Sequence, residues 1–475
     1  MGEITVAGDV GGVLHWGTAK TQRSVRDMAA QKDLTTGPLG KQVLVFSVPL
    51  IASNLLQVLF NMADVAVVGR FAGTIALGAV GSTTILVSLF TGLLIGLSSG
   101  VNVLAALHFG AKAKRELAET VHASALVCAL AGTLLLAVGV VFARSILALM
   151  GTKPELIGGA VLYLRIYLLG MPALGVYNFG NAVFSAVGDT RRPLVYLSVA
   201  GAVNVALNLF FVIVCRLDVA GVAIASVTSQ YISAALIVRA LFRAGSEPYG
   251  LRVGELRLYR KRVKSILAIG VPSGLQSAIF SLANLFIQAG VNTFDAVMVA
   301  GNSAATNADA LVYDTMAAFY TACSSFMGQN FGAGKKARIR RSYLVSMGYS
   351  FGFGLGLGLL LLAFGPQFLS LFTKDPAVVE AGMKRLTIMS VSYGFSAFMD
   401  CTIAASRGLG RSLGPMVIVI LGSCVFRVIW VYTVFAWFGT ITSLYLLYIF
   451  SWAITAAAEI WYFIRAYRKE TAGMT

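Results

Sequence analysis

Long apolar runs recur along this chain and set its basic pattern. About twelve of them are long enough to cross a bilayer, and they begin near residues 43, 75, 118, 157, 193, 219, 264, 297, 342, 380, 415 and 440. Backbone polar groups inside lipid must be hydrogen-bonded within the protein, so runs of this length predict helices. We therefore expect an all-α, polytopic membrane protein with twelve transmembrane helices.

Short motifs repeat at a constant spacing, which divides the chain into two related halves. The matching pairs, 222 residues apart except for the last two at 223, are Phe109-Gly110-Ala111 with Phe331-Gly332-Ala333, Gly188 with Gly410, Pro193 with Pro415, Pro49 with Pro272, and Asn61 with Asn284. A register held over so many positions indicates an internal repeat. Six helices per repeat is an even number, so both halves enter the membrane from the same face. We expect two lobes related by an axis along the membrane normal.

The repeat and the polar stretches between apolar runs predict the division of the chain. We expect a cytosolic N-terminal tail (1–40), an N-lobe of six helices (41–243), a basic cytoplasmic linker (244–263), a C-lobe of six helices (264–468) and a short C-terminal tail (469–475). Residues 1–40 lack the apolar core of a signal peptide and are interpreted as a tail that leads into the first membrane helix.

The composition indicates a membrane protein and excludes one class of partner. Hydrophobic residues make up 57% of the chain and charged residues 12%, about half the charged fraction of soluble domains. The net charge of +17 by itself suggests a nucleic-acid binder. However, most Lys and Arg fall in alternate loops and near the two ends, which is the positive-inside asymmetry. We therefore expect a multi-pass protein of the cytoplasmic (inner) membrane with both termini in the cytoplasm, and no nucleic-acid partner.

Several strings of residues resemble those of bacterial multidrug and toxic compound extrusion (MATE) transporters, over residues 34–468. They are Leu34-Thr35-Thr36-Gly37-Pro38, Pro49, Asn61-Met62-Ala63-Asp64, Val68-Gly69-Arg70, Gly188-Asp189-Thr190-Arg191-Arg192-Pro193 with Asn204 and Asn208, and Gly328-Gln329-Asn330-Phe331-Gly332-Ala333. The resemblance implies a secondary active antiporter. Such a protein exports small organic compounds in exchange for Na⁺ or H⁺ by alternating access of its two lobes.

Asp64 is an acid within an apolar stretch, where a carboxylate is costly and normally has a partner or a function. Asn204 and Asn208 are four residues apart and share one helix face. The resemblance places Asp64, Asn181, Asn204, Asn208 and Ser226 in the cation site of the N-lobe. Carboxylate, amide and hydroxyl oxygens suit Na⁺, a hard cation, and the carboxylate can carry a proton instead. A helix cap at Asp64, and helix packing by the asparagines, are the structural alternatives. Some relatives have a second acid where this chain has Asn208.

The second half has different polar residues. The position equivalent to Asp64 is Ile287. Asp400 and Arg427 flank the Gly408–Pro415 loop at similar distances, so an antiparallel helix pair places them at similar depth. We predict an intramembrane ion pair between them, with either a structural or a transport role.

Two further acids and nearby aromatic residues are candidates for substrate binding. Asp309 and Asp314 lie within one predicted helix of the C-lobe, and Tyr313 and Phe60 are aromatic residues that can line a cleft between the lobes. An acid with aromatic rings suits a lipophilic cation. We therefore expect cationic or amphiphilic substrates, with pairing of Asp314 to another residue as the alternative.

Other classes of function find little support. The three histidines and the absence of a G-x-x-x-x-G-K-[ST] string argue against an enzyme and against ATP-driven transport. The five cysteines lack metal-ligand spacing, and we expect no cofactor beyond the coupling Na⁺ or H⁺. We expect a monomer whose partners are small-molecule substrates, the coupling cation and the lipid bilayer. A flippase of lipid-linked precursors with the same two-lobed architecture, or a membrane scaffold that transports nothing, are the alternatives.

Overall fold

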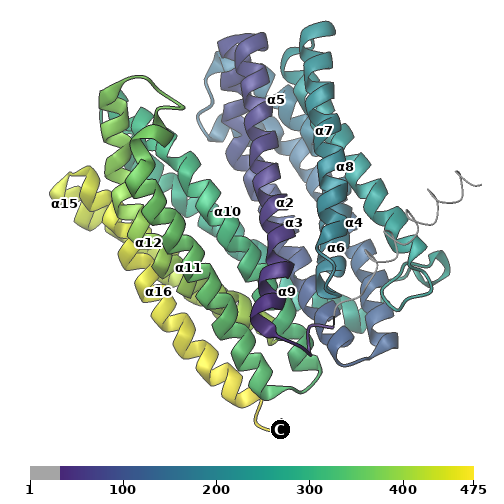
Figure 1. Cartoon of the computed structure of the whole chain (residues 1–475). Coiled ribbons are helices and arrows are strands. Elements are labelled where there is room, and N and C mark those ends of the chain that lie inside the picture. Colours follow the sequence, from purple (N-terminus) through teal and green to yellow (C-terminus); the bar gives the residue numbers. More distant parts are fainter. Residues whose placement is uncertain (1–32, 475) are drawn as a thin grey trace, which may run out of the picture.

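The computed structural model describes residues 33–474, and residues 1–32 of the predicted tail lie outside this range, as does Thr475. The described chain folds into long helices, and no strand occurs within it (Figure 1). The first half comprises α2 (Leu39–Val67), η1 (Val68–Ala72), α3 (Gly73–Gly110), α4 (Lys114–Leu149), α5 (Pro154–Leu168), α6 (Met171–Ala186), α7 (Arg191–Leu209), η2 (Phe210–Val214) and α8 (Asp218–Arg243). After η3 (Val253–Glu255), the second half comprises α9 (Arg260–Val291), α10 (Ala296–Gly332), α11 (Lys336–Leu369), α12 (Pro376–Gly408), α13 (Leu413–Val419), η4 (Ile420–Val425), α14 (Phe426–Trp430), η5 (Val431–Phe435), α15 (Ala436–Phe438) and α16 (Ile441–Glu470).

The predicted twelve-helix organisation is confirmed. By length and apolarity, nine helical segments of the described chain can cross a membrane, or ten when α5 and α6, which meet at a bend of 46°, form one span. One of the nine, Leu39–Gly110, holds both α2 and α3. These helices separate at Gly73, whose φ of 87° breaks the helical path. Helix α10 has 37 residues, enough to span, and its polar side chains explain why it is not among the nine. Separating α2 from α3 and adding α10 gives twelve.

The helices group into two lobes, α2 to α8 and α9 to α16. Figure 1 shows the two groups side by side, closer together at the end where α2 begins and diverging toward the other end. Side chains that face outward on α4 are apolar: Leu130, Leu134 and Val141 are 56%, 63% and 68% exposed. An apolar outer surface is expected of a protein whose surrounding solvent is lipid.

Close approach of helix backbones joins the lobes, because α3 packs against α9 and α10. A Cβ atom added to Gly96 would lie 2.2 Å from the backbone nitrogen of Gly274, so only glycine fits at this crossing. On α10, Ser325 donates a 3.2 Å hydrogen bond to the side-chain oxygen of Asn102 on α3. Asn102 and Ser324, which also donates to this oxygen, are equivalent positions in the 222-residue repeat. Equivalent residues that meet across the interface agree with the expected axis between the lobes.

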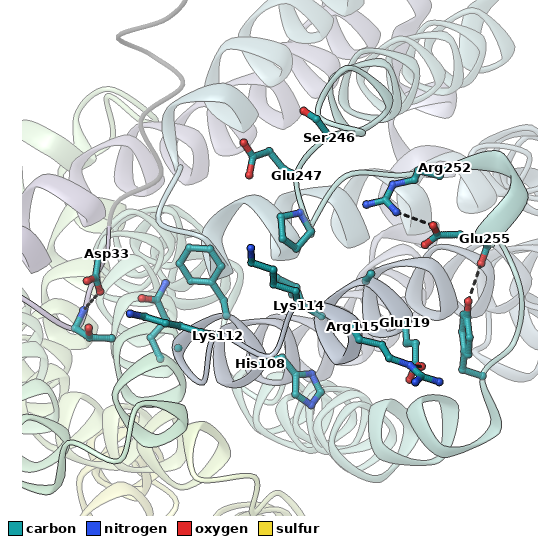
Figure 2. A pocket seen from close by; sticks show the side chains of 18 of the residues that line it. Asp33, His108, Lys112, Lys114, Arg115, Glu119, Ser246, Glu247, Arg252 and Glu255 are labelled. Carbon is teal, nitrogen blue, oxygen red and sulfur yellow. Dashed lines mark hydrogen bonds and ion pairs between the residues drawn. The ribbon is translucent and has the colours of Figure 1, made fainter.

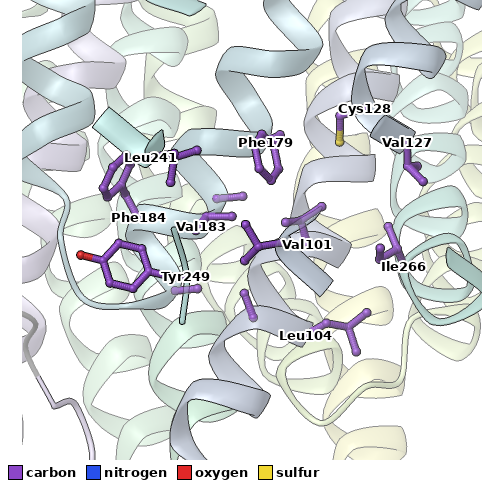
Figure 3. Packing of buried hydrophobic residues seen from close by; sticks show 14 of the residues in the cluster. Val101, Leu104, Val127, Cys128, Phe179, Val183, Phe184, Leu241, Tyr249 and Ile266 are labelled. Atoms are coloured by element: carbon purple, nitrogen blue, oxygen red, sulfur yellow. The ribbon is translucent and has the colours of Figure 1, made fainter. Parts of the chain in front are cut away.

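Apolar packing fixes the helices around the candidate site. Figure 3 shows part of the largest cluster of the N-lobe, in which Val101 and Leu104 of α3 pack with Phe179 and Val183 of α6. The cluster extends to Ile266 of α9 in the other lobe. Dense packing of this kind holds helices in fixed positions, so polar side chains between them have fixed neighbours.

Candidate functional site

Four polar residues meet in the N-lobe around the carboxylate of Asp64. Asn208 donates a hydrogen bond from its amide nitrogen to Asp64 Oδ1, and Ser226 donates one of 3.2 Å to Asp64 Oδ2. The same amide of Asn208 lies 3.4 Å from the side-chain oxygen of Asn204. Asn204, Asn208 and Ser226 are all buried. Each of these interactions joins side chains of different helices or of one helix face inside the N-lobe.

Three helices bring these residues together. Asp64 lies on the last turn of α2, three residues before the helix ends at Val67. Asn204 and Asn208 occupy one face of α7 because they are four residues apart, and Ser226 lies on α8. Asp64 lies near a helix end, as the alternative interpretation of a helix cap requires. Its carboxylate nevertheless bonds α7 and α8, and does not cap α2.

The cluster borders a cavity of about 350 Å³ inside the N-lobe. Helices α2, α3, α5, α6, α7 and α8 all contribute to its wall, and polar lining residues include Gln57, Asn61, Asp64, Thr91, Tyr163, Tyr167, Asn178, Asn204, Ser226 and Gln230. Asp64 is the only charged side chain among the described residues that line it. The cavity therefore combines one acid with neutral hydroxyl and amide groups.

Asn178, which the sequence interpretation did not include in the cation site, lines this cavity, whereas Asn181 is absent from its described wall. The two residues are three apart on α6. The side-chain oxygen of Asn181 is buried without a hydrogen-bond partner among the described residues. The repeat contained a usable signal, because Asn178 is the position equivalent to Asp400 at a spacing of 222.

The prediction of a direct ion pair between Asp400 and Arg427 is wrong. No ion pair joins them among the described residues. Asp400 on α12 instead accepts hydrogen bonds from the hydroxyls of Tyr313 (2.8 Å) and Ser396 (2.9 Å). Matched depth along two helices does not fix the direction in which the side chains point, and neutral hydroxyl donors satisfy this carboxylate.

Arg427 is fully buried and is held by aromatic rings and an amide. Its Nη1 donates a 2.8 Å hydrogen bond to the side-chain oxygen of Asn284 on α9. The guanidinium carbon lies 4.4 Å, 5.1 Å and 5.8 Å from the ring centroids of Phe280, Tyr448 and Trp452. Cation–π attraction in a desolvated site takes the place of the carboxylate partner.

Asp309 is also misplaced by the sequence interpretation, because it does not face a substrate cleft. It is 8% exposed, and Arg385 of α12 forms an ion pair of 2.6 Å with its Oδ2. Tyr393 donates a hydrogen bond to the other oxygen. Arg385 lies 76 residues away in sequence, and no local motif links the two positions. Asp309 thus helps to hold α10 against α12 inside the C-lobe.

The remaining substrate candidates lie in three different places. Asp314 is half-buried on α10, and its backbone oxygen accepts a 2.8 Å hydrogen bond from Asn54 of α2, which puts it at the interface between the lobes. Tyr313 points its hydroxyl into the C-lobe toward Asp400, which contradicts the prediction that it lines the cleft. Phe60 lines the Asp64 cavity.

A larger cavity, of about 950 Å³, lies at the end of the N-lobe that carries the loop between α3 and α4 and the linker (Figure 2). Two ion pairs lie in its wall: Arg252 with Glu255 at 2.6 Å, and Arg115 with Glu119 at 3.0 Å. The larger volume does not make this cavity the better candidate. Exposed, paired charges at loops contribute little binding energy, whereas the Asp64 cavity holds an acid among buried polar groups.

The Asp64 cluster has the donor set of a small-cation site. Oxygens of the Asp64 carboxylate, the Asn204 amide and the Ser226 hydroxyl lie close together there, and hard cations prefer oxygen ligands. The side-chain oxygen of Asn208 is buried and has no hydrogen-bond partner among the described residues. The amide nitrogen of the same side chain is the atom that faces the Asp64 carboxylate. The residues present thus fit a small hard cation.

Comparison with known proteins agrees with the fold. The family described as MatE matches residues 49–210 and again residues 272–433, at the 223-residue spacing of the repeat. The probable multidrug resistance protein YpnP of Bacillus subtilis (strain 168) is 27% identical over 407 residues, covering 86% of this chain and 91% of that protein.

A second relative carries a different description. The FAD transporter of Shewanella oneidensis is 25% identical over 402 residues, covering 82% of this chain and 87% of that protein. Among solved structures, the outward-facing conformation of a multidrug resistance MATE family transporter superposes with a TM-score of 0.85 at 22% identity, covering 92% of this chain and 98% of that one. The two family matches cover more than half of the chain, so this protein belongs to the MATE (MatE) family of membrane transporters.

Proposed function

We propose that this protein is a secondary active multidrug efflux antiporter, which exports small amphiphilic or cationic organic compounds in exchange for Na⁺ or H⁺ bound at Asp64. The observation that carries the proposal is the single acid of the N-lobe cavity, hydrogen-bonded by Asn208 and Ser226. Membership of the MATE family and the relatives described as multidrug resistance proteins support the export of organic compounds.

The coupling cation and the substrate compete for the same cavity in this proposal. Cation binding at Asp64 replaces hydrogen bonds to Asn208 and Ser226 with cation–oxygen contacts, and changes how α2 packs against α7 and α8. A cation bound in one state and released in the other can shift the equilibrium between the two states only through this difference in affinity. The two-lobed repeat provides the rocking motion for alternating access.

Everted membrane vesicles test the proposal. Efflux of a fluorescent cationic dye is measured while the Na⁺ gradient and the pH gradient are collapsed one at a time, with vesicles lacking the protein as control. We expect one of the two treatments to stop dye movement. Movement that persists without either gradient would contradict antiport at Asp64.

The substrate panel also separates the alternatives. It includes a cationic dye, a neutral amphiphile, a flavin dinucleotide because of the relative described as an FAD transporter, and a lipid-linked sugar pyrophosphate. A flippase needs a basic central cavity for its pyrophosphate. Arg385 and Arg427 are instead held by Asp309 and by aromatic rings. Movement of the lipid-linked sugar alone would replace export of organic compounds with the flippase function.

A further inference from the structure

The C-lobe contains a buried acid that the proposed mechanism does not use. Glu459 of α16 is 0% exposed, and neither of its carboxylate oxygens has a hydrogen-bond partner among the described residues. The position equivalent to Glu459 in the N-lobe, at the 222-residue spacing, is Ile237, which is also fully buried. The acid is therefore a feature of one lobe, placed where the other lobe has an ordinary apolar residue.

Arg407 of α12 is the cation that acts on Glu459. No ion pair joins the two side chains among the described residues, because Arg407 is turned elsewhere: its Nη2 donates a 2.8 Å hydrogen bond to the side-chain oxygen of Gln276 on α9. The Nε of Arg407 is buried without a partner among the described residues. Arg407 thus has a neutral acceptor on one helix and an unused acidic acceptor on another.

A buried carboxylate without a hydrogen-bond donor is strongly disfavoured in its charged form, by several kcal/mol even after relaxation. A guanidinium cannot release its proton in a protein. Of the two groups, only Glu459 can become neutral. The observed arrangement, with Arg407 on Gln276 and Glu459 without a donor, is the one expected when the carboxyl group carries a proton.

The neutral acceptor Gln276 lies close to the contact between the two lobes. It is two residues after Gly274, whose backbone packs against Gly96 of α3 in the other lobe. Whether Arg407 holds Gln276 therefore affects the helix on which the two lobes meet. When Glu459 loses its proton, the bare carboxylate becomes the better acceptor for Arg407, because a charge-assisted bond is roughly twice as strong as a neutral one.

We propose that Glu459 is a second proton-binding site of this transporter, and that its protonation decides whether Arg407 bonds Gln276 on α9 or Glu459 on α16. With the proton bound, Arg407 holds α9. When the proton is released, Arg407 pairs with Glu459, and its hydrogen bond to Gln276 of α9 is lost. Proton binding at Glu459 is independent of Asp64, and only its consequence for transport rests on the proposed antiport.

Other ionisable groups around Glu459 are few. From α12, Asp400 acts on it together with Arg407, and Tyr462 lies on its own helix. Helix α16 also packs against α13, η4, α14, η5 and α9. In these elements the ionisable side chains are Cys424, Arg427, Tyr432 and the basic residues at the beginning of α9, namely Arg260, Lys261, Arg262 and Lys264. Asp400 is the other carboxylic acid in this set, and it differs from Glu459 because it accepts hydrogen bonds from the hydroxyls of Tyr313 and Ser396.

Infrared titration of the purified protein in lipid nanodiscs tests the site without any transport. We expect a carbonyl band of a protonated carboxylic acid that Glu459→Gln removes, by the intensity of one group. Glu470→Gln is the matched control on the same helix, since Glu470 is ion-paired with Arg411, and it should leave the band unchanged. The Glu459 band should also persist in Asp64→Asn. A spectrum of Glu459→Gln equal to that of the wild-type protein overturns the proposal.

Variants of Arg407 and Gln276 test the switch, by which we mean the change of partner of Arg407 between Gln276 and Glu459. They also test the proposal if Glu459→Gln fails to fold. Arg407→Gln removes the cation, so the band should persist to higher pH. Gln276→Leu removes the neutral acceptor and frees Arg407 for Glu459, so the band should disappear at lower pH. Shifts in opposite directions support the switch. No shift in either, or shifts in the same direction, overturns it. If these spectra behave as expected while gradient-driven efflux is absent, the proposed antiport fails and the proton site stands.

Discussion

The two lobes share one fold and differ in their polar interiors. In the N-lobe, a single acid, Asp64, is surrounded by the neutral amides of Asn204 and Asn208 and the hydroxyl of Ser226, beside a cavity of about 350 Å³. The C-lobe holds both buried acids and buried arginines, and its acids differ in their partners, since Asp400 accepts hydrogen bonds from neutral hydroxyls. Asp309 is paired with Arg385, and Arg427 is enclosed by aromatic rings.

The difference indicates a division of roles between repeats. Ile287, the C-lobe position equivalent to Asp64, is 3% exposed and belongs to an apolar cluster, so the C-lobe has no acid there. A lone acid with neutral neighbours can exchange one small cation for another with little rearrangement. An acid locked to an arginine cannot, because releasing it leaves an unpaired buried charge. The variants below test this contrast, from the largest expected effect to the smallest.

The largest effect is expected for Asp64→Asn. Among the described residues, Asp64 is the only charged one that lines the N-lobe cavity, so its removal should reduce gradient-driven dye efflux to the level of vesicles without protein, while expression and thermal stability stay normal. Efflux from everted vesicles measures this. Asp218→Asn is the matched control, because Asp218 is an exposed acid of the same lobe. Wild-type efflux in Asp64→Asn would remove the basis for the N-lobe cation site.

The second-largest effect is expected on the free energy of unfolding, when the Asp309–Arg385 ion pair of the C-lobe is broken. Asp309→Asn or Arg385→Gln alone should destabilise the protein by about 3–5 kcal/mol, because each leaves a buried charge without its partner. The double variant should be less destabilised than the two single effects added together. Unfolding of the purified protein in detergent measures all three. Strict additivity would show that the pair contributes no coupling energy.

A smaller coupling is expected between Asp400 and Arg427, which have separate partners. Asp400→Asn and Arg427→Gln should each be harmful, and the double variant should come close to their sum. The same unfolding assay gives the coupling energy. A value as large as that for Asp309 and Arg385 would indicate that the two groups pair directly in a populated conformation.

The smallest effect is expected for Asp314→Asn, at the interface of α2 and α10. Loss of a cation–carboxylate contact worth about 1 kcal/mol should weaken apparent affinity for cationic dyes roughly fivefold, and should leave neutral compounds unaffected. Concentration dependence of efflux for one compound of each class measures this. Asp295→Asn, at the N-cap of the same helix, is the control, because asparagine caps equally well. Equal loss for both classes would assign Asp314 to the fold or to the transport cycle.

Much of the fold follows from the sequence because its signals are local or periodic. The twelve predicted starting points lie within six residues of observed helix beginnings, since apolar length alone decides which segments enter lipid. The repeat indicated two lobes, and two matches to one family agree with it. The i, i+4 spacing of Asn204 and Asn208 placed both on the face that meets Asp64, because a helix fixes that geometry by itself.

Only the tertiary structure decided which charges meet. Asp309 and Arg385 are 76 residues apart, and in an apolar sequence no amphipathic pattern indicates which way each one points. The same ambiguity hid the separation of Asp400 from Arg427 and the burial of Glu459 near Arg407. Side-chain direction inside a membrane bundle is set by rotation of each helix against its neighbours. That rotation depends on packing across the whole lobe, which short stretches of sequence do not encode.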